Sequence, residues 1–369
     1  MQRRKFLGSS VAGATGVAAA VATLSTPPVH AQTPAGTKWR MATMWPKGLD
    51  TLFGSADALG KRVTAVSAGA FDLKVFAAGE ISPAPQVFEN VSLGTVECGH
   101  VLSSFFTGRN PAFAFDAGVA FGLNTRQQNA WMYHGGGIEL MRELFKPYNI
   151  VPIPCGNVGV QMGGWYRKEI KTVADLKGLK FRIGGLGGTI MTKLGVVPQQ
   201  IPGGDIYSSL ERGVIDAAEW IGPYDDEKLG LNKVAKYYYS PGWWEGSAQI
   251  TLLVNLKAWE ALPKVQQELL DTACAEQMTS MVAKYDAKNP EALKRLVANG
   301  TQLRSFPKPV MDACYKATEE TLAELAGKSP EFSKLLDSWR KFRDDQNLWF
   351  RVAENTLDTY RYNVSAAKK

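Results

Sequence analysis

The residues of this chain that could carry chemistry centre on one arginine. Arg182 stands at the end of the apolar stretch 179–183 and is followed by the glycine-rich segment 184–188. A guanidinium group can meet both oxygens of a carboxylate, and glycines leave room for another group to approach. This arrangement predicts a carboxylate-binding site at the exit of a strand. An isolated arginine is more often exposed on the surface, so other residues must support the prediction.

The glycine-rich segment does not predict nucleotide binding. Its spacing matches neither G-x-G-x-x-G nor G-x-x-x-x-G-K-[ST], the patterns of loops that bind phosphates.

Glu219 is the second candidate, because it follows the apolar run 214–218 and precedes Trp220. A carboxylate in so apolar a setting needs a partner, which a nearby lysine could supply. Asp225 and Asp226 are interpreted as helix-capping or surface acids, since no general acid accompanies them.

The N-terminus and the charge balance define the compartment and exclude one class of partner. Residues 1–31 carry Arg3-Arg4-Lys5 and then small apolar residues, which indicates an export signal of the twin-arginine type, with an ordinary Sec signal as the alternative. Its removal takes three positive charges from the net charge of +7 and leaves about +4. The remaining basic residues are scattered among acids, so no nucleic-acid partner is expected.

The cysteines form no metal-binding pattern. Cys98, Cys155, Cys274 and Cys314 contain no C-x-x-C pair, which argues against zinc. In an oxidising compartment Cys274 and Cys314 are the pair expected to form any disulfide, with free buried thiols as the alternative. No Ser/His/Asp or Cys/His constellation points to an enzyme.

Strands and helices alternate along the chain. A strand at 38–45, a helix at 53–68 and a strand at 71–76 open the pattern, which continues to 149–155 and restarts at 160. This is typical of parallel α/β sheets covered by helices, which bind ligands beyond the carboxyl ends of their strands. Trp45, Ser104 and Asn157 follow predicted strands and are expected to line a cleft.

The mature length of about 340 residues predicts two lobes. We assign 37–159 plus 250–290 to lobe I and 160–249 plus 291–331 to lobe II, with 250–256 as a strand that returns to lobe I. From 258 onward the pattern is helical. Residues 332–369 form a C-terminal helical region in which Trp339, Trp349 and Phe350 pack either on their own chain or in a dimer.

Several motifs in order resemble the solute-binding proteins of tripartite ATP-independent periplasmic (TRAP) transporters. They are DLKGLKFR at 175–182, LERGVIDAAEW at 210–220 and YYSPGWWEG at 238–246. Gln161, the pair Glu219-Trp220 and the last motif mark the metal-assisted branch, which binds 2-oxo and 2-hydroxy monocarboxylates. The resemblance covers the whole mature chain.

The resemblance implies a two-lobed periplasmic binding protein with a cleft and a long helical C-terminus. It implies a homodimer that hands a small monocarboxylate to TRAP permease subunits, and an exported enzyme is the alternative. A sodium or calcium ion is expected on oxygen donors. The implied cation ligands are Gln161, Glu219 and the backbone carbonyl of Trp220. The implied ligand-binding residues are Arg182, Gln161, Asn157, Ser104, Phe105, Trp45, Trp220 and Glu245.

The chain departs from this family at one place. It has Ser103-Ser104-Phe105-Phe106 where relatives carry tyrosines, so a phenol donor to the ligand is lost. Ser104 could donate over a shorter reach. A ligand bulkier than pyruvate therefore stays open, including pyroglutamate and aromatic or branched oxo acids.

Overall fold

The computed structural model describes residues 36–366, so the expected export signal lies outside the described residues. The first of two mixed sheets has the order β2 (Phe71–Phe76), β1 (Thr37–Thr43), β3 (Cys98–Val101), β10 (Gln249–Asn255), β4 (Ile150–Asn157). Strand β1 is parallel to β2 and β3, whereas β10 is antiparallel to β3 and β4. The prediction of a parallel sheet was wrong here, because β10 re-enters the first sheet in the opposite direction after the chain has built most of the second.

The second sheet has the order β11 (Gln302–Ser305), β9 (Tyr237–Ser240), β5 (Gly164–Tyr166), β8 (Ala217–Ala218), β6 (Lys180–Arg182), β7 (Val197–Gln199). Strand β5 is antiparallel to both of its neighbours, and the other pairs are parallel. The sequence pattern missed β11, because this strand has only four residues and lies between two long helices.

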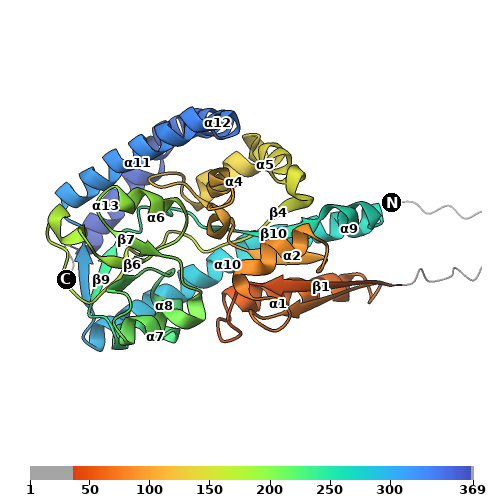
Figure 1. The fold of residues 1–369 in the computed structure, drawn as a ribbon, viewed down its shortest axis with the longest axis horizontal. Coiled ribbons are helices and arrows are strands. Elements are labelled where there is room, and N and C mark those ends of the chain that lie inside the picture. Colours follow the sequence, from red (N-terminus) through yellow and green to blue (C-terminus); the bar gives the residue numbers. More distant parts are fainter. Residues whose placement is uncertain (1–35, 367–369) are drawn as a thin grey trace, which may run out of the picture. The chain divides into compact units, whose positions relative to one another are not determined.

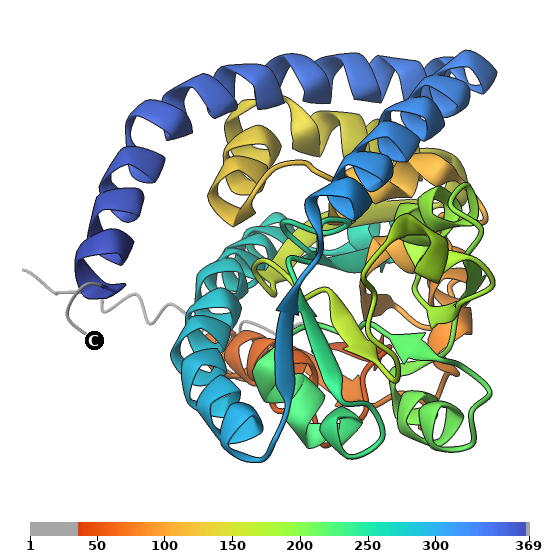
Figure 2. The same ribbon diagram turned by 90° about the vertical axis from the view of Figure 1, so that its left-hand side faces the viewer.

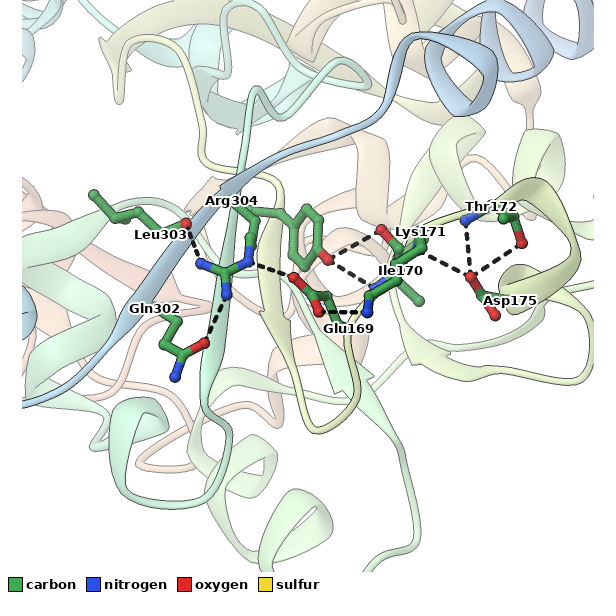
Figure 3. A network of polar contacts seen from close by, with 9 residues as sticks. Glu169, Ile170, Lys171, Thr172, Asp175, Gln302, Leu303 and Arg304 are labelled. Atoms are coloured by element: carbon green, nitrogen blue, oxygen red, sulfur yellow. Dashed lines mark hydrogen bonds and ion pairs between the residues drawn. The ribbon is translucent and has the colours of Figure 1, made fainter.

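Side chains fix the edge of the second sheet (Figure 3). Arg304 of β11 donates from Nε to Glu169 Oε1 at 2.5 Å. The hydroxyl of Tyr239 on β9 accepts from the backbone N–H of Ile170 at 2.7 Å and lies 3.1 Å from its carbonyl oxygen. These contacts hold the loop after β5 against β9 and β11.

Helices cover both sheets (Figure 1). In the first half they are α1 (Leu52–Val66), α2 (Val87–Ser92), α3 (Ala114–Ala117), α4 (Thr125–His134) and α5 (Gly137–Phe145). Helices α6 (Gly185–Thr192), α7 (Ile206–Glu211) and α8 (Pro223–Lys228) belong to the second, and α9 (Leu256–Ala261) follows β10. The long helix α10 (Lys264–Ala298) contacts both β4 and α8, so it runs past both halves. None of the helices in the described part of the chain is long and apolar enough to span a membrane.

The C-terminal region consists of α11 (Lys308–Lys328), α12 (Pro330–Val352) and α13 (Glu354–Ala366). Trp339 is fully buried and packs on Phe115 with ring centroids 6.1 Å apart, so it packs on its own chain and is not available to a dimer interface. In contrast, Trp349 is 59% exposed. Helix α13 turns away from the end of α12 and buries none of its residues (Figure 2).

The four cysteines are free thiols. Cys274 lies in one buried cluster with Cys98 and Cys155, whereas Cys314 belongs to a separate cluster. The disulfide between Cys274 and Cys314 is therefore not formed, and the alternative of buried free thiols is the one observed.

Candidate functional site

A pocket with about 450 Å³ of empty volume collects most of the predicted site residues. Its lining includes eight of the nine: Trp45, Ser104, Phe105, Gln161, Arg182, Glu219, Trp220 and Glu245. These residues come from segments that follow β1, β3, β4, β8 and β9, together with the last residue of β6. Their convergence explains why residues so far apart in sequence can form one site.

Arg182, the last residue of β6, is 2% exposed and uses most of its donors within the protein. Its Nε donates to the carbonyl of Ile201 at 3.0 Å, and its Nη1 donates to the carbonyl of Glu219 at 2.8 Å and to the Glu219 carboxylate. Buried Nη2 has no partner among the described residues. The expected grip on both carboxylate oxygens through two nitrogens does not fit this arrangement, since only Nη2 is available to a ligand.

Two aromatic rings flank the guanidinium of Arg182. Its carbon lies 5.1 Å from the ring centroid of Trp220 and 5.5 Å from that of Phe105. Guanidinium groups stack favourably on such faces, and the rings also exclude water. The free Nη2 is thereby held in a fixed direction within an apolar wall.

Glu219 follows β8 and is 6% exposed. Its partner is Arg182, not a lysine. Burial raises the pKa of this carboxyl, while the positive charge of Arg182 lowers it. Because an unpaired carboxylate is costly in such a place, this ion pair offsets part of the cost of burying Glu219.

Gln161 supplies an oxygen that nothing in the described chain uses. Its side chain is 3% exposed, and its Oε1 is buried without a hydrogen-bond partner. The backbone around it is fixed, because Gln161 accepts from the N–H of Gly242 at 2.9 Å and donates to the carbonyl of Glu245 at 3.3 Å. An amide oxygen, a carboxylate and nearby carbonyls in one pocket fit a hard cation such as sodium or calcium.

Glu245 faces the same pocket and is held by Ser104, whose hydroxyl donates to Glu245 Oε1 at 3.0 Å. Burial raises the pKa of Glu245 to about 8, and the negative charge of Glu219 adds to this effect. Near neutral pH the group is therefore mostly protonated in this arrangement.

The glycine-rich segment 184–188 allows two walls of the pocket to pack closely. Gly185 opens α6 with φ of +60°, and a Cβ on it would lie 3.0 Å from the Cβ of Ser104. Glycine thus allows α6 to approach the Ser104 segment closely.

Three sequence predictions turn out differently in the structure. Asn157 is the last residue of β4 and is not among the lining residues; its Nδ2 donates to Ser247 Oγ at 2.8 Å and its Oδ1 accepts from the N–H of Gly159 at 2.9 Å. Asp225 and Asp226 are fully buried, so they are not surface acids, and the N-cap position of α8 is Gly222, so neither caps that helix.

These two aspartates tie α8 to its surroundings. Asp225 accepts from Thr51 Oγ1 at 2.6 Å and from the hydroxyl of Tyr285 at 2.7 Å. Asp226 accepts from Trp165 Nε1 at 2.9 Å, and burial raises its pKa to about 7. Sequence patterns do not indicate these partners, because Thr51 and Tyr285 are far away along the chain.

The remaining walls of the pocket are apolar and were not predicted as a set. They include Leu52, Leu102, Val158, Ile221, Ala248 and Ile250, together with Trp244. Aliphatic residues carry no chemical signal in a sequence, so only the fold assigns them to a pocket.

Residues 41–329 match the family of bacterial extracellular solute-binding proteins, family 7. The chain belongs to this family. It is a periplasmic solute-binding protein of the TRAP transporters and not an enzyme. It is 47% identical over 361 residues to a monocarboxylate 2-oxoacid-binding periplasmic protein of Nostoc, an alignment that covers 98% of this chain and 99% of the relative.

Solved structures of other TRAP solute-binding proteins are similar to this binding protein. One from Bordetella bronchiseptica is 59% identical, with a TM-score of 0.89 over 90% of this chain and 99% of that one; it is a mixed-occupancy dimer with one site holding co-purified calcium and picolinate and one apo site. One from Colwellia psychrerythraea, with calcium and pyruvate, is 36% identical, with a TM-score of 0.85 over 88% and 99% of the two chains. One from Pseudoalteromonas atlantica, with sodium and pyruvate, is 37% identical, with a TM-score of 0.85 over 87% and 98%.

Proposed function

We propose that this TRAP solute-binding protein binds a 2-oxo monocarboxylate such as pyruvate together with a sodium or calcium ion. The observation that carries the proposal is that two polar atoms in one buried pocket lack hydrogen-bond partners among the described residues. They are the donor Arg182 Nη2 and the acceptor Gln161 Oε1. A carboxylate satisfies the first and a cation the second. Relatives with pyruvate and either calcium or sodium support the same pairing.

The residues take distinct roles in this proposal. Arg182 Nη2 donates to the ligand carboxylate, and Gln161, the Glu219 carboxylate and the Trp220 carbonyl hold the cation. When bound, the cation supplies positive charge and open coordination positions for ligand oxygens. Ser104 keeps Glu245 in place at the wall, while Trp45, Phe105 and Trp220 enclose the carbon chain. Asn157 acts indirectly, by fixing the turn that leads to Gln161.

Charge explains why a cation is needed. Arg182 and Glu219 already cancel each other, so a ligand carboxylate enters as an uncompensated negative charge in a buried site. A sodium ion balances that charge. A calcium ion leaves one positive charge over, which Glu245 balances if it ionises.

Picolinate is a second candidate ligand, favoured by the aromatic walls that Phe105 and Trp220 form around Arg182. Its ring nitrogen stands next to the carboxylate, as the 2-oxo oxygen does in pyruvate, so both ligands offer a cation two adjacent donors. The relative from B. bronchiseptica holds picolinate with calcium.

The assembly is part of the same proposal. Lobe I (37–159 plus 250–290) and lobe II (160–249 plus 291–331) close around the ligand, and the closed protein presents it to the permease. Two chains form a homodimer through the exposed apolar side chains of α12 and α13, among them Leu348, Trp349, Val352, Leu357 and Tyr360. A dimeric relative supports this assembly.

Isothermal titration calorimetry tests the ligand. Purified protein is stripped of ions by partial unfolding in chelator, refolded, and titrated with pyruvate, picolinate or L-lactate in calcium, in sodium, or in neither. We expect saturable binding of one ligand per chain without turnover, and much weaker binding in the absence of both ions. If neither pyruvate nor picolinate binds in either ion, the proposal is wrong.

A further inference from the structure

The indole N–H groups of the pocket differ in an informative way. Three tryptophans line it, and Trp45 Nε1 donates to His100 Nδ1 at 2.8 Å. The Nε1 atoms of Trp220 and Trp244 are buried and form no hydrogen bond of normal geometry among the described residues, although Trp244 lies close to the Glu219 carboxylate. Their residues are 6% and 3% exposed, so bulk water does not compensate for the missing acceptors. Buried donors of this kind are rare and costly, which points to an acceptor that enters the pocket.

The acceptor positions of a carboxylate match these donors in number. A carboxylate offers about four lone-pair positions. On the function proposed above, the cation takes one of them and Arg182 Nη2 takes another. About two positions are left for the indole groups of Trp220 and Trp244.

We propose that the indole N–H groups of Trp220 and Trp244 donate hydrogen bonds to the carboxylate of the bound ligand and thereby select carboxylates over neutral analogues. This inference rests on the proposed function and adds two specificity-determining residues to it. Pyruvamide makes the difference concrete. It keeps two adjacent oxygens for a cation, but the N–H groups of its amide would face the indole N–H groups, so two donors would meet without an acceptor.

Two other buried tryptophans provide controls in the same molecule. The Nε1 atoms of Trp131 and Trp339 also lack partners, but neither residue lines the pocket. A missing partner is thus not sufficient evidence for a ligand contact. The position of Trp220 and Trp244 in the pocket wall is what assigns them to the ligand.

The first experiment is a proton–nitrogen correlation spectrum of the full chain with ¹⁵N-labelled tryptophan. The ten tryptophans give up to ten indole signals. The spectrum is recorded in calcium before and after pyruvate is added. We expect the signals of Trp220 and Trp244, assigned by their loss in Trp220→Phe and Trp244→Phe, to move downfield. The signals of Trp131 and Trp339 should stay in place.

The second experiment measures affinity by calorimetry. Trp220→Phe and Trp244→Phe keep an aromatic ring and lose only the donor and part of the ring system. Each should bind pyruvate roughly ten- to a hundredfold more weakly, as expected for a lost hydrogen bond to a charged group. In each variant the preference for pyruvate over pyruvamide should fall together with the affinity for pyruvate. Trp131→Phe should bind pyruvate as the unmodified chain does.

The outcomes separate this inference from the proposed function. If the unmodified chain binds pyruvate while both indole signals stay fixed, or both variants keep full affinity and selectivity, the inference is wrong and the proposed function stands. If the unmodified chain binds neither pyruvate nor picolinate, both are wrong. Should a variant fail to fold, the spectrum of the unmodified chain still decides, since two indole signals must move.

Discussion

Arg182 and Glu219 form a buried ion pair in which one guanidinium nitrogen, Nη1, contacts both the backbone carbonyl and the carboxylate of the same glutamate. The pair uses one side of the guanidinium and leaves Nη2 free on the other. On the proposed function, Arg182 thus stabilises the protein and binds the ligand with different atoms. A substitution at this position is therefore expected to affect both properties.

Arg182→Met should destabilise the fold by about 3–5 kcal/mol, because it leaves the Glu219 carboxylate buried and unpaired. Urea denaturation and calorimetry measure the two properties separately. The matched control is the double variant Arg182→Met/Glu219→Gln, which removes both charges. It should recover most of the stability but not pyruvate binding. A single variant as stable as the unmodified chain would contradict the importance of the pair.

Gln161→Leu tests the cation site, because it removes the unpaired Oε1 and keeps the approximate size of the side chain. Calcium and pyruvate should each bind more tightly in the presence of the other, by the same factor. In Gln161→Leu that factor should fall by tenfold or more. Titrations of calcium with and without pyruvate measure it, and Gln86→Leu at an exposed position is the control. An unchanged factor would show that Gln161 holds no cation.

The sequence predicted the fold class, and eight of its nine predicted site residues line the pocket, because charged, amide and aromatic side chains occur in an ordered set of motifs. What it could not predict were contacts between distant segments. Asp225 looked like a surface acid, since nothing near it in sequence shows Thr51 or Tyr285 as partners. The direction of β10 depends on the path of the chain between the lobes, which the hydrophobic periodicity of the sequence does not predict.

The pH dependence of stability should contain a contribution from Asp116. This carboxyl is fully buried and accepts from Ser103, Gln249 and Thr251, and burial raises its pKa to about 6. Between about pH 4 and pH 6 the folded chain keeps a proton that the unfolded chain has released. This contribution is full below about pH 4 and is lost as the pH rises through about 6.

Asp116→Asn isolates that contribution, because an amide stays neutral at every pH. Relative to the variant, the unmodified chain should lose up to about 3 kcal/mol of stability between pH 4 and pH 7. Urea denaturation at several pH values measures the difference. Parallel curves for the two proteins would show that Asp116 does not titrate in this range.

Truncation after residue 352 tests the dimer. It removes α13, which buries none of its residues, so the remaining chain should fold and bind pyruvate normally. Light scattering should then find a monomer where the full chain is a dimer. Truncation before residue 332 is the contrasting case, because it also removes the buried Phe332, Leu335, Leu336 and Trp339 and should lower the melting temperature strongly. A full chain that is monomeric at high concentration would rule out the interface.

Thr51 connects the start of α1 to Asp225 in the first turn of α8, four residues after the pocket residue Ile221. Thr51 is 1% exposed and its neighbour Leu52 lines the pocket, so the bond to Asp225 joins the two walls next to the site. Thr51→Val removes the hydroxyl without changing the shape. It should cost about 1–3 kcal/mol, because Asp225 keeps only part of its donors. Thr51→Ser should restore stability, because serine keeps the hydroxyl. If this bond forms as the lobes close, pyruvate titrations should show weaker binding in Thr51→Val than in Thr51→Ser and in the unmodified chain. Equal affinities in all three proteins would mean that the bond stabilises the fold without contributing to closure.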